Sequence, residues 1–426
     1  MVLYKRYLIL FNIILFNVVF AYGQQNRFSN SIYYPSIHSL RAFVEGNEQS
    51  YPVIELFGDN HILIEFDDLG SNERDYSYQI IHCNYDWSVS ELLSDEFIDG
   101  FNENTIQDFD YSVNTKIGYI NYRVSLPNSD VQFKVSGNYV LRVIENGNRD
   151  STVLTVRFMV YEPVVNVVAE VIRPLGARVQ NNSQEVKLSI NHEQLEISDP
   201  FNDVKVVITQ NNRPDRVIKD IKPVFVRNNE LVYSFSGDIV MPAGNEFRTF
   251  AFTNIHKYGI NVNDIQFVDT IYHVQLRIDE RRSSKRYFWE EEMNGKNIVY
   301  INNSDDAYRA ADYAFVYFSL PVDEPFLEGK VYVYGGLTQW KTNEANLMHY
   351  NFDTKMYEAI LLLKQGYYDY IYTYFDTYTH KLDESVLEGS HYQTENDYLI
   401  FVYHRGFSQN YDRLVGYQIA NSKYKE

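Results

Sequence analysis

The feature that most constrains this chain is a repeated alternation of apolar and polar residues in short segments. In 151–160, apolar residues from Leu154 to Val160 alternate with the polar Thr155 and Arg157. Because neighbouring side chains of a strand point to opposite faces, this pattern predicts a strand with one face in the core and one in water. The same alternation recurs at 139–144, 186–191, 203–210, 311–320, 329–336, 357–364, 368–375 and 397–405.

Turn signals between these segments favour an all-β fold. The segments 139–144 and 151–160 flank an Asn-Gly turn and predict a hairpin. Helical periodicity is nearly absent, and only 88–101 could hold one short helix. The chain has 38 Tyr and 27 Phe against 6 Met, a composition typical of strands. We therefore predict three tandem β-sandwich domains of the immunoglobulin-like or early-set type.

Composition shifts suggest where these domains begin and end. The first predicted domain spans 24–163 and closes at Pro163, the second spans 164–280, and the third spans 281–426. A charged stretch at 277–286 marks the second boundary and is interpreted as a linker or a sheet edge.

The N-terminal residues predict export. Residues 1–23 have Lys5 and Arg6, an apolar run to Phe20, and small residues at Ala21 and Gly23, as a signal peptide does. An uncleaved anchor is the alternative, and no later segment has the apolar length of a membrane span. Export usually permits disulfides, but a single cysteine excludes an internal one.

The charge of the chain restricts its partners. The formal net charge is −19, so nucleic acid and anionic membrane surfaces would repel it. Direct membrane insertion is not expected either. A protein with a basic cavity or rim is the partner that this charge favours.

The segment IIHCNYDW at 80–87 holds the only cysteine, next to a histidine, and is therefore the first candidate for a catalytic site. In a strand, His82 and Cys83 point to opposite faces and cannot form a catalytic pair. Cys83 is interpreted as a buried packing residue and Trp87 as a core or inter-sheet anchor. The sequence shows no phosphate loop, nucleophile elbow or metal-ligand spacing, so we expect no enzyme activity, no metal and no cofactor.

The C-terminal block resembles early-set modules, including the glycogen-binding type. The resemblance rests on Gly335, Gly336 and Trp340, then Gly366 before tyrosines at 368, 370, 372 and 374. It implies a sheet with aromatic residues that could stack on a sugar. The same glycines and tyrosines also serve as scaffold, so carbohydrate binding is kept as the alternative function and is not the favoured one.

Taken in order, several segments resemble the plug protein family of the type 9 secretion system. His82, Cys83, Asn84, Asp86 and Trp87 are its most specific part, and 394–403 is second. Tyr85 departs from the small residue expected there. The remaining segments are 51–60, 76–101, 111–128, 136–148, 241–250, 311–321, 332–340 and 388–405.

The resemblance implies a periplasmic protein associated with the outer membrane through a translocon barrel. It would seal the periplasmic opening of that barrel as a gate and not as a catalyst. For the docking face we choose 88–110, a long acidic segment outside clear strands. The alternative is that its phenylalanines cap the core. The chosen residues are Asp95, Glu96, Phe97, Asp99, Phe101 and Phe109.

Overall fold

The computed structural model describes residues 28–423 except 71, 149, 177, 234–236, 238 and 303–305. The predicted leader at 1–23 lies outside the described residues. Within them the regular structure is mostly strand, as predicted, and α2 lies inside the predicted helical segment at 88–101. The helical elements are α2 (Ser94–Phe97), α3 (Ala307–Ala310), α4 (Ser385–Glu388) and the 3-10 turn η1 (Gly336–Thr338).

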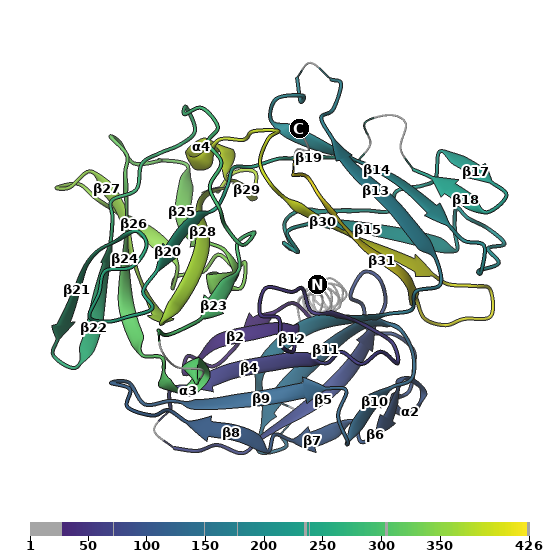
Figure 1. Cartoon of the computed structure of the whole chain (residues 1–426), viewed down its shortest axis with the longest axis horizontal. Coiled ribbons are helices and arrows are strands. Elements are labelled where there is room, and N and C mark those ends of the chain that lie inside the picture. Colours follow the sequence, from purple (N-terminus) through teal and green to yellow (C-terminus); the bar gives the residue numbers. More distant parts are fainter. Residues whose placement is uncertain are drawn as a thin grey trace, which may run out of the picture.

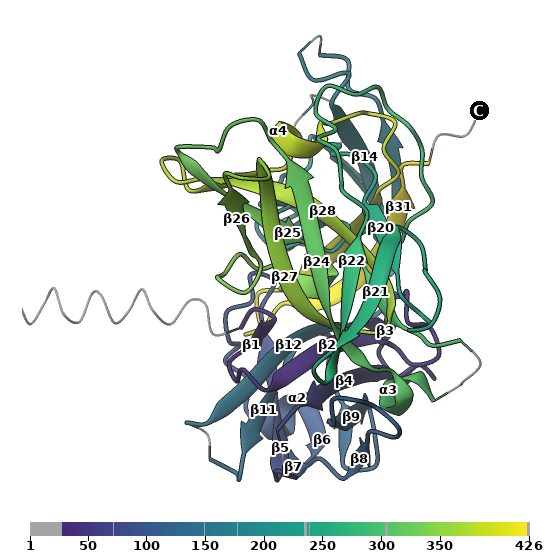
Figure 2. The ribbon, with the colours of Figure 1, turned by 90° about the vertical axis from the view of Figure 1, so that its left-hand side faces the viewer.

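The strands form three groups that meet around the centre of the molecule. Figure 1 shows the N-terminal sheets at the bottom, a ten-stranded sheet at the left, and a third group at the right. Figure 2 shows the ten-stranded sheet standing on the N-terminal sheets.

The first group has two main sheets and a two-stranded one. One main sheet contains β1 (Ser31–Ile32), β12 (Thr152–Tyr161), β11 (Gly137–Glu145), β5 (Tyr76–Cys83), β7 (Glu103–Thr105) and β3 (Val53–Glu55). The other contains β2 (Ile37–Val44), β4 (Ile62–Asp68), β9 (Ile120–Leu126) and β8 (Asp108–Tyr111). The small one pairs β10 (Val131–Phe133) with β6 (Ile98–Gly100). Apolar side chains of both main sheets share one hydrophobic cluster.

Strand β12 confirms the predicted core face but not the predicted solvent face. It pairs with β11 as the predicted hairpin, and Leu154 and Phe158 point into the cluster between the sheets. The opposite face is not in water as predicted, because Thr155 is buried and donates a hydrogen bond of 2.7 Å to the Ser29 carbonyl. The chain before β2 covers this face, which no local pattern reveals.

The second group combines distant parts of the chain. One sheet holds β13 (Asn166–Ile172), β14 (Ser183–Asn191), β18 (Glu230–Val232), β17 (Phe225–Arg227) and β19 (Val240–Pro242). The other has the order β16 (Val217–Lys219), β15 (Val204–Gln210), β30 (Asp397–His404) and β31 (Arg413–Asn421).

The third group is one sheet that curves into a nearly closed barrel (Figure 1). Its path is β20 (Arg248–Ala251), β28 (Gly366–Asp376), β25 (Gly329–Tyr334), β26 (Leu347–Asn351), β27 (Met356–Lys364), β24 (Tyr313–Pro321), β22 (Ile271–Leu276) and β21 (Val262–Val268). Two further strands pair with β28, namely β23 (Asn297–Val299) and β29 (Lys381–Asp383). The immunoglobulin-like or early-set type stays a prediction.

The sheets do not follow the predicted boundary at 280. Strand β30, from the last predicted domain, pairs with β15 along its length, while β20 to β22 join the ten-stranded sheet. Residues 277–286 contain no strand, and the Arg282 guanidinium contacts the Glu388 carboxylate at 2.7 Å. The stretch therefore packs beside the ten-stranded sheet. The division into three domains stays a prediction.

Candidate functional site

The motif at 80–87 ends strand β5 and turns the chain back on itself. The Asn84 amide donates to the Ser88 carbonyl at 2.8 Å, and the Ser90 amide donates to the His82 carbonyl at 3.0 Å. Trp87 adopts a left-handed backbone with φ 69° to make this reversal. The motif therefore fixes where the segment 88–110 begins.

His82 joins the motif to that segment through its buried ring. Its Nε2 donates to the Ser136 carbonyl at 3.2 Å, so Nδ1 is the acceptor for the Ser90 hydroxyl at 2.9 Å. The ring packs against Phe97 and Tyr139 at centroid distances of 5.7 and 5.0 Å. Burial lowers the pKa of His82 to about 4, so the ring is neutral at pH 7.

Cys83 is fully buried and follows His82 in the strand, so its side chain lies on the other face. Burial raises the pKa of its thiol to about 12. A thiol with that pKa supplies almost no thiolate at neutral pH, and thiolate is the reactive form. The packing interpretation of Cys83 accounts for this environment.

The rest of the motif contacts other parts of the fold. The Asn84 side-chain oxygen accepts from Arg405 at 2.6 Å, which ties the turn to the loop between β30 and β31. Asp86 accepts from the Ser88 hydroxyl at 2.6 Å inside the turn. Trp87 is half-buried, with the Arg157 guanidinium 4.3 Å from its ring centroid. The ring thus packs between sheets and not within the first core.

The segment 88–110 presents the acidic residues chosen for docking. Asp95, Glu96 and Asp99 are exposed on or beside α2. Glu96 also accepts a hydrogen bond of 2.6 Å from the Leu93 amide, which caps the short helix. The Lys134 ammonium donates to the Asp95 carbonyl at 2.6 Å, which ties the segment to the chain just after β10.

The three phenylalanines of this segment have different environments. Phe97 is 5% exposed and belongs to the first hydrophobic cluster, and Phe109 is half-buried against the Tyr122 ring at 5.5 Å. Only Phe101 projects outward, with 78% of its surface exposed. Capping of the core is therefore the structural role of Phe97 and Phe109. Leu93, which the sequence analysis did not select, is 68% exposed nearby.

The glycine–tryptophan corner of the C-terminal block is architectural. The Gly336 amide donates to the Gly295 carbonyl at 2.7 Å, and a Cβ at 336 would lie 2.8 Å from that oxygen. A side chain there would force the two loops apart. Trp340 packs against Phe247 and Tyr334 at 5.9 and 5.3 Å.

Three of the four alternating tyrosines of β28 are buried, and the fourth, Tyr374, is half-buried with its ring centroid 5.1 Å from that of Phe326. Tyr368, Tyr370 and Tyr372 are each at most 3% exposed. The hydroxyls of Tyr370 and Tyr372 both donate to the Asp279 carboxylate, at 2.6 and 2.7 Å. Rings buried in this way cannot stack on a ligand, so the alternating pattern fills the sheet interior.

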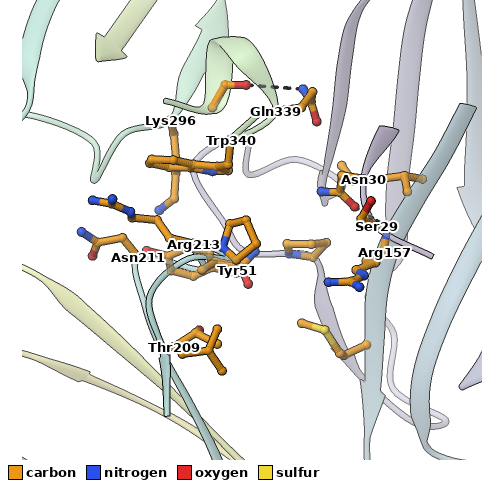
Figure 3. Close-up of a pocket in the computed structure, with 18 of the residues that line it drawn as sticks. Ser29, Asn30, Tyr51, Arg157, Thr209, Asn211, Arg213, Lys296, Gln339 and Trp340 are labelled. Carbon is orange, nitrogen blue, oxygen red and sulfur yellow. Dashed lines mark hydrogen bonds between the residues drawn. The ribbon is translucent and has the colours of Figure 1, made fainter. Parts of the chain in front are cut away.

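A cavity of about 420 Å³ lies where the three groups of strands meet, and sequence reasoning missed it. Figure 3 shows Arg157, Thr209 and Lys296, from three different parts of the fold, around this space. No spacing in the sequence brings these residues together. Within the described ranges, no three His, Cys, Asp or Glu side chains group as a metal site would need. Among the described residues, no helix has the length and apolar character that crossing a membrane requires.

Comparisons with known proteins identify two relationships. The family model described as type 9 secretion system plug protein first domain matches residues 37–162. A crystal structure of a hypothetical protein from Parabacteroides merdae is 37% identical, with a TM-score of 0.89, and the match covers 92% of this chain and 99% of that chain.

A second match among solved structures is too weak to indicate a shared fold. A protein of Corynebacterium diphtheriae described as membrane-anchored is 8% identical, with a TM-score of 0.13 over 91% of this chain and 92% of that one. No curated protein matches the chain.

Proposed function

The chain belongs to the plug protein family of the type 9 secretion system, and we propose that it is a non-catalytic plug of the translocon. It acts in the periplasm, associated with the outer membrane through the translocon barrel. It binds the periplasmic opening of that barrel and seals it. A wide water-filled barrel would leak small solutes if nothing closed it.

The observation that carries the choice of docking face is the exposed part of 88–110. Three exposed carboxylates, on Asp95, Glu96 and Asp99, lie between the exposed apolar residues Leu93 and Phe101 in the sequence. An apolar anchor with a charged rim is the arrangement of a non-obligate protein interface. The hydrogen bonds around His82 hold this segment in place, so docking would order few residues.

The charge of the chain supports an electrostatic approach to the barrel. A net charge of −19 favours a basic rim as the partner surface. Exposed charges are screened beyond about 10 Å at 0.1 M salt. The association rate with the barrel should therefore fall as salt rises.

Permeability of the outer membrane tests the sealing function. Deleting the protein should admit small dyes or antibiotics when the barrel is present and should have no effect when the barrel is absent. Unchanged permeability in cells that contain the barrel would contradict the plug function.

A charge-reversal variant tests the docking face separately. Changing Asp95, Glu96 and Asp99 to lysine should slow association with the purified barrel and raise permeability. A matched control changes the exposed acids Asp323, Glu324 and Glu328 of the ten-stranded sheet group. If only the control variant weakens binding, the sealing function is retained and the chosen docking face is wrong.

A further inference from the structure

The cavity between the three groups of strands is a basic site in an acidic protein. Six basic and two acidic side chains line its 420 Å³, whereas the whole chain has 38 basic and 57 acidic residues. Tryptophan rings from two different parts of the fold, Trp87 and Trp340, line it as well. A space of this size accommodates a small molecule and not a folded partner.

Two of its arginines are already neutralised. Arg41 contacts Glu48 at 2.5 Å and also pairs with Glu65. Arg213 contacts Asp215 at 2.8 Å and Glu384 at 2.7 Å. These cations are satisfied by the protein itself.

The other four cations of the wall have no carboxylate in an ion pair among the residues that the structure describes. Lys219 is exposed, whereas Arg157, Lys296 and Lys341 are half-buried. Burial lowers the pKa of the three half-buried cations, that of Arg157 to about 10. For Lys296 more distant carboxylates oppose this effect, whereas for Lys341 the charge of Arg157 adds to it.

Arg157 and Lys341 are held close by neutral groups. The Arg157 Nε donates to the Phe28 carbonyl, and the Lys341 ammonium donates to the Ser29 hydroxyl at 2.8 Å. Adjacent residues of one segment thus hold two like charges that repel each other. Neutral acceptors reduce the cost of desolvation but do not cancel the charges, and an anion between them would.

A second observation, an unpartnered hydroxyl, supports a binding site here. The Thr209 hydroxyl lines the same cavity and is buried without a hydrogen-bond partner among the described residues. Buried hydroxyls in native structures nearly always have partners. The chain's own residues 24–27, QQNR, would add positive charge to the site, so charge complementarity argues against them as the occupant.

We propose that this cavity binds a small organic anion whose carboxylate or phosphate group lies between Arg157 and Lys341. Apolar parts of the ligand would contact Trp87 and Trp340. The bound ligand would connect β12 with the corner after η1 and so stabilise the arrangement of the three groups. This site is separate from the 88–110 segment and does not depend on the sealing function.

Fluorine NMR of the mature chain labelled with 5-fluorotryptophan tests the site. The chain has three tryptophans, and two line the cavity, which leaves Trp289 as an internal control. Titration with inorganic phosphate, citrate or phenyl phosphate should shift the Trp87 and Trp340 signals saturably and leave Trp289 unchanged. The phosphate and citrate arms distinguish the two anion types, and tighter binding of phenyl phosphate would support the apolar contact.

Variants decide whether the shift comes from the proposed cations. Lys341→Gln should weaken binding about tenfold, because it removes one charge-assisted contact. Arg157→Gln serves as the second variant if the first fails to fold, and the exposed Lys257→Gln is the matched control. The proposal is overturned if no anion shifts the cavity signals, if Trp289 shifts equally, or if Lys257→Gln weakens binding as much as the cavity variants.

Discussion

The Lys364 ammonium lies 2.7 Å from the Asp67 carboxylate, and the two side chains are 1% and 0% exposed. Asp67 belongs to β4 and Lys364 to β27, so this buried ion pair joins the N-terminal sheets to the ten-stranded sheet. The Tyr313 hydroxyl and the Asn121 amide donate to the same carboxylate at 2.6 and 2.8 Å. The contact is thus fully hydrogen-bonded on its acidic side.

Removing one member of this pair should be costly. Lys364→Met leaves the Asp67 charge buried without its cation, and we expect the free energy of unfolding to fall by about 3–5 kcal/mol. Denaturant unfolding measures this. The double variant Lys364→Met with Asp67→Asn should lose less free energy of unfolding than the two single variants lose together. The exposed pair Lys330–Glu344 at 3.8 Å is the control, and Lys330→Met should cost less than about 1 kcal/mol.

His82 should make the protein less stable in mild acid. Its pKa of about 4 in the folded protein lies below the ordinary 6.5, so its contribution is complete above pH 6.5 and declines as pH falls toward 4. At pH 5 the loss should be about 2 kcal/mol. Wild type and His82→Gln share all other titrating groups, so the pH dependence of those groups drops out of the comparison. The difference in their free energies of unfolding should therefore narrow from pH 7 to pH 5. A constant difference would show that His82 does not titrate in this way.

Cys83 should be inert in the folded protein. Its raised pKa and full burial predict no reaction with a disulfide reagent until denaturant unfolds the chain. Cys83→Ser should cost about 1–3 kcal/mol, because it buries a hydroxyl in a site built for a thiol. Secretion should remain intact. Loss of secretion at normal protein abundance would instead indicate a redox or catalytic role.

Phe97 and Phe101 should separate stability from docking. Phe97→Ala removes a core side chain and should lower the free energy of unfolding by about 3–5 kcal/mol. Phe101→Ala should change it by less than about 0.5 kcal/mol, because the ring is exposed. Binding to the purified barrel should weaken for Phe101→Ala. Unaltered binding would exclude Phe101 as an anchor.

Local alternation was enough to place nine of the strands and to predict which of their residues share a face. These strands are β11, β12, β14, β15, β24, β25, β27, β28 and β30. The hairpin of β11 and β12 and the opposite orientation of His82 and Cys83 follow from a period of two residues, which any extended chain obeys. The packing role of the phenylalanine side chains was kept open, since hydrophobicity alone does not distinguish a core cap from a docking anchor. Burial of Phe97 beside exposed Phe101 separates the two.

Tertiary structure alone decided which distant strands pair and which residues meet at the centre. Val204 of β15 pairs with His404 of β30, and every strand between β15 and β30 in the sequence except β16 belongs to another sheet. Strand pairing of this kind depends on shape and edge complementarity between distant segments, and no local pattern encodes it. The cavity with Arg157 and Lys341 depends on the same long-range pairing. The sequence thus determined the longer alternating strands and which of their residues share a face, whereas the packing of three sheet groups created the basic site.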